Sequence, residues 1–246
     1  MIMAKLFQEI QKHGQVKFDL EFLIMNPGYN KENWELILHN AKVMGIPLTV
    51  FETDVFNIVE DIVDSPCYLC ARMRRGYLYS HAKELGCNKI ALGHHFDDVI
   101  ETILMGMLYS GKVETMMPKL HSKNFEGMEL IRPLYLVKEA DIVAWCKYNE
   151  LKFIQCACRF TEKAAMEGNE KLSKRDAVTA LINQLREESE IIEKNIFKSV
   201  TNINLKTIIG YHKDDWEYNF LDDYEERGKT NAERLRQEKE EQKESE

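Results

Sequence analysis

The sequence lacks the features that mark membrane, secreted and disulfide-stabilised proteins. No apolar run approaches the roughly 18 residues that a transmembrane helix requires. Residues 1–5 lack the basic segment and long apolar stretch of a secretory signal. Six cysteines in 246 residues are too few for a disulfide scaffold. We therefore expect a cytoplasmic protein with no membrane partner, whose reduced cysteines serve metal binding or catalysis rather than cross-links.

Excess positive charge is also absent. The 33 Lys and Arg residues are outnumbered by 41 Asp and Glu residues, which gives a formal net charge of −8. This balance argues against nucleic-acid binding by bulk positive charge and leaves a local basic groove possible. About half of the net charge lies in residues 222–246, where large apolar residues are scarce. Such a segment buries too little surface to offset its ordering entropy, so we predict a solvated helix or a disordered tail.

Segments typical of strands alternate with segments typical of helices over most of the chain. The predicted strands are residues 18–25, 46–51, 88–92 and 130–136. The predicted helices are residues 1–13, 33–44, 56–63, 70–85, 97–109 and 138–148, with a long helical region over 173–200. This alternation predicts an α/β fold with a parallel sheet that helices cover on both faces.

A polar motif, GHHFDDVIET over residues 93–102, joins a predicted strand to the helix that follows it. Ligands of open α/β sheets bind at the carboxyl ends of strands, so this position favours a binding site. Asp97 and Asp98 would either cap the helix or bind Mg²⁺ beside phosphates. Glu101 lies one helical turn beyond Asp97 and faces the same way. The candidate ligand-binding residues before them are Gly93, His94 and His95.

The cysteines form a second candidate site. Cys67 and Cys70 make a C-x-x-C motif at a predicted helix start, where the helix dipole and nearby arginines would stabilise thiolates. Cys156 and Cys158 form a second pair far downstream. Together these pairs favour metal binding over a redox dithiol. We interpret the other two cysteines, Cys87 and Cys146, as buried apolar residues rather than ligands.

Arginines next to the C-x-x-C motif suggest an anion site. Arg72, Arg74 and Arg75 follow Cys70 closely, either as a solvated helix face or as a local site for an anion or an RNA phosphate. Residues that would extend this basic surface are Lys112, Lys119, Lys123 and Arg132. A basic patch on an acidic protein is compatible with tRNA as a partner.

The C-x-x-C, R-R-G and G-H-H-x-D-D-x-x-E-T motifs of residues 67–102, followed by MMPKL and IRPL, resemble those of the tRNA 2-thiocytidine synthetases. These enzymes are ATP pyrophosphatases with a PP-loop. The resemblance implies a PP-loop, Rossmann-like α/β domain of the adenine-nucleotide alpha-hydrolase type over residues 1–160. A helical C-terminal region would follow over 161–221, and then the charged tail over 222–246.

The same resemblance implies an activity. ATP would adenylate the C2 oxygen of an anticodon-loop cytidine, at position 32 of the tRNA, and sulfur from a cysteine desulfurase or sulfide would displace AMP. The implied cofactors are ATP, Mg²⁺ and a 4Fe–4S cluster. Cys67, Cys70 and Cys156 match the cluster ligands, and Arg74 matches a catalytic basic residue. Asp97 and Asp98 match the acidic motif near ATP and Mg²⁺, with Gly93, His94 and His95 beside the nucleotide. A homodimer is implied as well.

The sequence departs from this family in two places. The second cysteine pair is C-x-C, so that either Cys156 or Cys158 could be the third ligand. The larger departure is at the N-terminal end, because no strand with an S-G-G-x-D-S loop precedes the first helix. In addition, no glycine lies in a phosphate-cradling pattern. That strand would lie at the centre of the sheet, and its loss would expose two rows of backbone hydrogen-bonding groups. We therefore expect this chain to be an N-terminally incomplete version of a full enzyme.

Other functions are compatible with the same residues. A tRNA lysidine synthetase-like ligase shares the Asp-Asp motif and needs no cysteine triad. A degenerate RNA-binding or metal-binding protein would have lost its ATP chemistry with the loop. Three cysteines could also hold zinc instead of an iron–sulfur cluster. The sequence leaves the role of residues 201–223 unassigned.

Overall fold

The computed structural model describes residues 1–60, 62, 66–153 and 174–227, without the side chains of residues 60, 66, 67, 226 and 227. Cys156, Cys158 and the predicted domain boundary at residue 160 therefore lie outside the described residues, as does most of the predicted tail. The chain divides into two units, Met1–Val200 and Thr201–Glu246. Among the described helices, none combines the length and the apolar character needed to cross a membrane.

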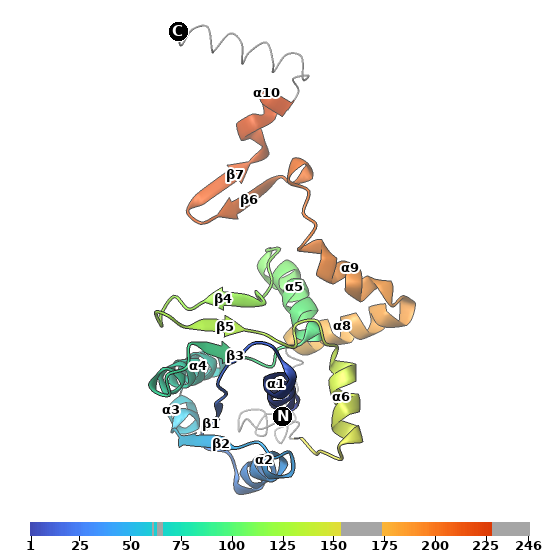
Figure 1. Ribbon diagram of the computed structural model, residues 1–246. Helices are drawn as coiled ribbons and strands as arrows, with labels where there is room; N and C mark the ends of the chain where they lie inside the picture. Colours follow the sequence, from blue (N-terminus) through green and yellow to red (C-terminus); the bar gives the residue numbers. More distant parts are fainter. Residues whose placement is uncertain (61, 63–65, 154–173, 228–246) are drawn as a thin grey trace. The chain divides into compact units, whose positions relative to one another are not determined.

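The first half of the first unit alternates helices and strands as predicted (Figure 1). Its elements are α1 (Ile2–His13), β1 (Phe22–Asn26), α2 (Lys31–Val43), β2 (Leu48–Glu52), α3 (Val55–Glu60) and α4 (Pro66–Glu84). Helix α4 begins at Pro66, four residues before the predicted start. Proline is favoured at the first helical position, where its missing N–H is not needed. Both cysteines of the C-x-x-C motif consequently lie in the first turns of α4.

The second half of this unit contains three short strands and four helices within its described residues. These are β3 (Lys89–Ala91), α5 (Phe96–Ser110), β4 (Lys119–His121), β5 (Glu129–Ile131), α6 (Glu139–Tyr148), α8 (Lys174–Glu188) and α9 (Ile191–Ser199). Strand β5 is shorter than the predicted strand over 130–136. Pro133 has no N–H to donate to a ladder, and the chain turns there, with Tyr135 N–H donating to the carbonyl of Arg132.

The described strands of this unit form two sheets where a single parallel sheet was expected. Strand β1 pairs with β2 in parallel, and β3 pairs with β5 in parallel. Strand β4, which was not predicted, adds to β5 in antiparallel orientation. Within the described part of the chain, β1 and β3 each pair along one edge only. Their other edges present backbone N–H and C=O groups that no described strand bonds.

Helix α4 packs on both sheets, because it contacts β1 as well as β3. Tyr79 and Ala82 of α4 are buried against Leu130 of β5, and Leu23 of β1 and Ile90 of β3 pack on the same cluster. Figure 1 shows α4 beside these strands. The shared apolar core therefore joins the two sheets without a common ladder of hydrogen bonds.

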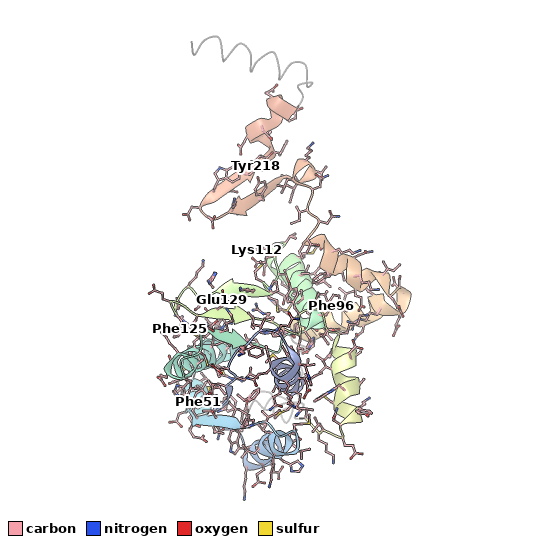
Figure 2. All side chains as sticks on the ribbon, viewed as in Figure 1. Phe51, Phe96, Lys112, Phe125, Glu129 and Tyr218 are labelled. Atoms are coloured by element: carbon pink, nitrogen blue, oxygen red, sulfur yellow. The ribbon has the colours of Figure 1, made fainter. Side chains whose placement is uncertain are left out.

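Helix α5 begins directly after the loop that follows β3. The side chain of Asp98 accepts a hydrogen bond from the backbone N–H of His95 at 2.9 Å, which satisfies one of the free donors at the helix start. The helix ends before Gly111, whose φ of 61° is easily adopted by glycine. Helix α8 packs on α5 through a cluster of Phe96, Ile100, Val178 and Ile182, and Figure 2 labels Phe96 in this region. Helices α8 and α9 are therefore part of the first unit.

The second unit is a hairpin with short helices. It contains η1 (Leu205–Thr207), β6 (Gly210–Lys213), β7 (Trp216–Asn219), η2 (Phe220–Asp223) and α10 (Tyr224–Arg227). Strands β6 and β7 are antiparallel, and Tyr211, Trp216 and Tyr218 pack their rings together. The predicted tail thus begins as helix from residue 222 to residue 227.

Candidate nucleotide and sulfur-transfer site

The loop between β3 and α5 carries the predicted ligand-binding residues Gly93, His94 and His95. Gly93 is exposed, and a Cβ atom added there would have no atom within 4 Å, so open space surrounds this part of the backbone. His94 and His95 are both partly buried. Among the described residues, His95 Nδ1 is buried without a hydrogen-bond partner. The loop therefore has room beside its backbone, and His95 Nδ1 lies 3.8 Å from Asp97 Oδ2.

Asp97 is buried in a network of charged groups, with 5% of its surface exposed. Its Oδ1 accepts a hydrogen bond from Arg186 Nη2, and its Oδ2 accepts one from the backbone N–H of Glu139 at 2.7 Å. Arg186 also donates from Nε to Glu193 at 2.7 Å. Lys138 donates to the other oxygen of Glu193, which is only 3% exposed. These contacts hold α8 and α9 against the start of α5.

Asp98 lies in the same network and is less buried. Its Oδ2 caps α5, and its Oδ1 pairs with Arg175 Nη2. Arg175 Nε donates to Glu101 at 2.8 Å, and the Thr179 hydroxyl donates to the other oxygen of Glu101 at 2.7 Å. We call this set the acid–arginine network; its members are Asp97, Asp98, Glu101, Glu193, Arg175, Arg186 and Lys138. Its cations and carboxylates are nearly equal in number.

The hydrogen bonds of the network determine how its carboxyl groups titrate. Burial acts to raise the pKa of Asp97, but hydrogen bonds from Glu139 N–H and Arg186, together with the Arg186 charge, lower it below its ordinary value. Burial likewise acts to raise the pKa of Glu193, and its hydrogen bonds with Lys138 and Arg186 outweigh that effect. Both groups are therefore ionised near neutral pH.

A pocket of about 250 Å³ lies on the other side of the loop, between α4 and β3. We call it the arginine pocket; it is lined by Ala71, Arg74, Arg75, Leu78, Tyr79, Ile90, Leu92 and His94. Arg74 Nε is buried and has no hydrogen-bond partner in the described part of the chain. Within those same residues, neither Arg74 nor Arg75 forms an ion pair with a carboxylate. The pocket thus carries positive charge that no described acidic group neutralises.

Arg132 orders the polar end of this pocket. Its Nε donates to His94 Nδ1 at 3.3 Å, and its Nη1 donates to the carbonyl of Met117. Burial and the Arg132 charge lower the pKa of His94, against the opposing charge of Asp98. The ring is therefore neutral at pH 7, and because Nδ1 accepts, its proton sits on Nε2. Burial, together with the positive charge of Arg75, lowers the pKa of Arg132.

The structure describes the predicted metal ligands only in part. Cys70 is 8% exposed and packs with Val55, Phe56 and Val59 of α3. Cys67 lies three residues earlier in α4, and the third ligand lies outside the described residues. No three described His, Cys, Asp or Glu side chains form a metal site. Cys87 and Cys146 are partly buried rather than buried as predicted, and burial raises the pKa of both thiols.

The structure thus places the predicted residues in two groups. Arg74 and His94 line one pocket, whereas Asp97 and Asp98 belong to the network on α5. The sequence analysis missed Arg175, Arg186 and Glu193. Arg175 and Arg186 are 11 positions apart, close to three turns of one helix, so they share a face of α8. That spacing was a usable signal, although nothing in the sequence pointed to their partners.

Comparison with known sequences and structures identifies the class of protein. The pattern of the PP-loop domain family matches residues 29–159. A solved structure, the U34-tRNA thiolase NcsA from Methanococcus maripaludis with its [4Fe-4S] cluster, has a similar fold, with a TM-score of 0.61. The likeness covers 85% of this chain and 72% of that one at 22% sequence identity. The fold is therefore that of a PP-loop protein.

Closer sequence relatives share one name, tRNA-cytidine(32) 2-sulfurtransferase. The relative from Syntrophotalea carbinolica is 30% identical over 207 residues, which cover 83% of this chain and 77% of that protein. The one from Coxiella burnetii is 33% identical over 82% of this chain and 76% of its own length. The one from Neisseria meningitidis is 38% identical over 61% of this chain, and the match spans about half of that relative, 48%. The chain therefore belongs to the PP-loop family and, within it, to the tRNA-cytidine(32) 2-sulfurtransferase family.

Proposed function

We propose that this protein thiolates tRNA in an ATP-dependent reaction that converts cytidine 32 to 2-thiocytidine. The observation that carries the proposal is the match to tRNA-cytidine(32) 2-sulfurtransferases over 83% of the chain. The C-x-x-C motif at the start of α4, directly before the arginine pocket, supports it. In the first step the cytidine O2 attacks the α-phosphorus of ATP, and pyrophosphate leaves. In the second step sulfide attacks C2, and AMP leaves with the oxygen.

The proposed nucleotide site includes Gly93, His94 and His95 of the loop, with Asp97 and Asp98 beside it. Of the two carboxylates, Asp98 fits Mg²⁺ better, because its Oδ1 meets only the half-exposed Arg175, which a metal ion could displace. Both oxygens of Asp97 already accept hydrogen bonds from the protein. In this proposal Asp97 fixes the start of α5, and Asp98 faces the metal. Arg74 would stabilise negative charge on the transferred phosphate.

We also propose that Cys67, Cys70 and Cys156 hold a 4Fe–4S cluster, although Cys156 and the side chain of Cys67 lie outside the described residues. Residues three apart in a helix lie on the same side, which lets Cys67 and Cys70 approach one ion or cluster. Thiolates are the ligands that such clusters require, and the dipole at the start of α4 favours them. A cluster held by these three residues would supply an iron site for sulfide. The arginines that follow in α4 would keep the thiolates ionised.

Cysteine variants test the cluster and the activity together. We expect anaerobically purified protein to be brown with about four irons per chain. Cys67→Ser, Cys70→Ser and Cys156→Ser should each lose the visible absorbance and the thiolation of tRNA while circular dichroism stays unchanged. Cys146→Ser is the matched control and should keep both. Colourless protein with about one zinc per chain would contradict the cluster and the sulfur-transfer role of these cysteines.

ATP binding also requires backbone N–H groups that cradle phosphates. None of the 12 glycines lies in such a pattern, whereas β1 and β3 both have an unpaired edge within the described residues. The predicted homodimer stays a prediction.

A further inference from the structure

We propose that the arginine pocket is a phosphate-binding site in which Arg132 is a positioning residue. In this arrangement Arg132 holds the His94 ring so that its Nε2–H meets the same phosphate oxygens as Arg74 and Arg75. The inference deepens the proposed function and rests on it for the role of the pocket in thiolation. Phosphate binding itself follows from the geometry of the pocket.

The charge of the pocket determines the class of ligand. A buried or half-buried charge without a partner is costly, so cations in a concave site are expected to meet an anion. Arg74 Nε is a buried donor without a described partner, and Arg75, which is exposed, adds a second guanidinium to the wall of the pocket. Planar guanidinium groups match phosphate oxygens with paired hydrogen bonds. An anion with several oxygen atoms, such as phosphate, therefore completes the site.

Parallel strand pairing brings Arg132 and His94 together. Ala91 of β3 is paired with Ile131 of β5, so the residues just after these strands emerge at the same edge. Arg132 follows β5 directly, and His94 follows β3 by three residues. Arg132 then spans from the Met117 carbonyl to His94 Nδ1. Because Nδ1 accepts this bond, the neutral ring offers Nε2–H as its only donor.

The pocket has a volume of about 250 Å³ and is open to solvent, so it has room for a phosphate whose attached group extends out of it. The phosphate could belong to ATP or to the backbone of the tRNA. Both sources present the same oxygen atoms to the arginines.

Calorimetric titration of the full chain with inorganic pyrophosphate tests the site. We expect Arg132→Gln and His94→Ala to weaken binding about tenfold, the effect of one hydrogen bond to a charged group. Arg132→Lys keeps the charge but cannot reach both partners, so it should bind as weakly as Arg132→Gln. Arg72→Gln removes the same charge from the exposed side of α4 and should stay within about twofold of wild type. Circular dichroism confirms that each variant is folded.

A second readout separates positioning from general structural damage. In Arg132→Gln the pKa of His94, followed by NMR, should rise, because the nearby positive charge and the donor to Nδ1 are both lost. Wild-type affinity in Arg132→Lys would overturn the positioning role, since charge alone would then suffice. Equal weakening by Arg72→Gln, or no binding of pyrophosphate, would overturn the site.

Competition experiments identify the source of the phosphate. Displacement of pyrophosphate by ATP, but not by an anticodon stem-loop RNA, assigns the pocket to the nucleotide; the reverse assigns it to tRNA. Displacement by neither overturns a role for the site in the proposed reaction. A chain that binds pyrophosphate through Arg132 and His94 but never thiolates cytidine contradicts the proposed function and leaves this inference standing.

Discussion

The acid–arginine network and the arginine pocket flank one loop and use arginine in opposite ways. In the network, Arg175 and Arg186 each contact two carboxylates from α5 or α9. In the pocket, Arg74 and Arg75 meet no carboxylate among the described side chains. The first arrangement satisfies its charges within the protein and joins three helices. The second leaves its charges for an anion from outside.

The contrast separates residues that hold the fold from residues available for chemistry. A shifted pKa alone does not distinguish the two kinds of residue, because the pKa of Asp97 and that of His94 are both lowered. What differs is whether the partner of each charged group is already present. Asp97, whose partners are complete, has a structural role, whereas the buried Arg74 Nε, which has no described partner, indicates a binding site.

The largest effect should come from removing an arginine of the network. Arg186→Ala leaves Asp97 and Glu193 buried without their shared cation, so we expect the free energy of unfolding to fall by about 3 kcal/mol. Urea denaturation measures this change. Arg72→Ala, on the exposed side of α4, is the control and should change it by less than about 0.5 kcal/mol. Similar values for both variants would remove the distinction between the two regions.

The second largest effect should come from acid, which removes the stabilising contribution of the acid–arginine network. The pKa values of Asp97 and Glu193 are lower in the folded chain than in the unfolded chain, so the unfolded chain binds protons first as pH falls. Their stabilising contribution is present above about pH 4.5 and is lost as the pH falls through the lowered folded values. Urea denaturation between pH 6 and pH 3 should show this loss. Arg186→Ala should flatten the curve; an unchanged curve would contradict the assignment.

A carboxylate placed in the arginine pocket should have the smallest effect on stability. Ala71 is exposed and lines this pocket, so Ala71→Glu gives the arginines an internal partner. We expect pyrophosphate affinity to fall about tenfold while the free energy of unfolding changes by less than about 0.5 kcal/mol. Ala71→Gln controls for side-chain size and should bind normally. Loss of affinity in both variants would point to steric blockage instead.

Periodicity and turn residues predicted most of the helices and the first three strands of the first unit. They did not predict β4 or the division into two sheets. A three-residue strand such as Lys119–His121 is too short to show alternation. Sheet order depends on which strands pair, and local patterns contain no information on pairing. The hairpin of the second unit was left unassigned because Asp214-Asp215 is not one of the strongest hairpin turn pairs.

The candidate site could be predicted where its polar residues lie close together in the sequence. The loop over residues 93–98 was found because its polar residues follow an apolar strand and lead into a helix. The partners of Asp97 could not be found, because Arg186 lies 89 positions away and looks like a solvated helix residue. Arg132 was named only as an extension of a basic surface. Its bond to His94 depends on the register of β3 against β5, which emerges on folding.

Helix α4 packs on both sheets, and this has a consequence for how the first unit opens. Amide protons of β1–β2 and of β3–β5 belong to separate ladders, so each ladder can exchange with solvent without breaking the other. Helix α4 couples their exchange, because it packs on both. Loosening Tyr79 or Ala82 would therefore let the two sheets exchange at different rates while the strands within each sheet still exchange together. Helix α4, which carries the cysteines at its start and the arginines in its middle, thus sets whether the unit opens as one body or as two.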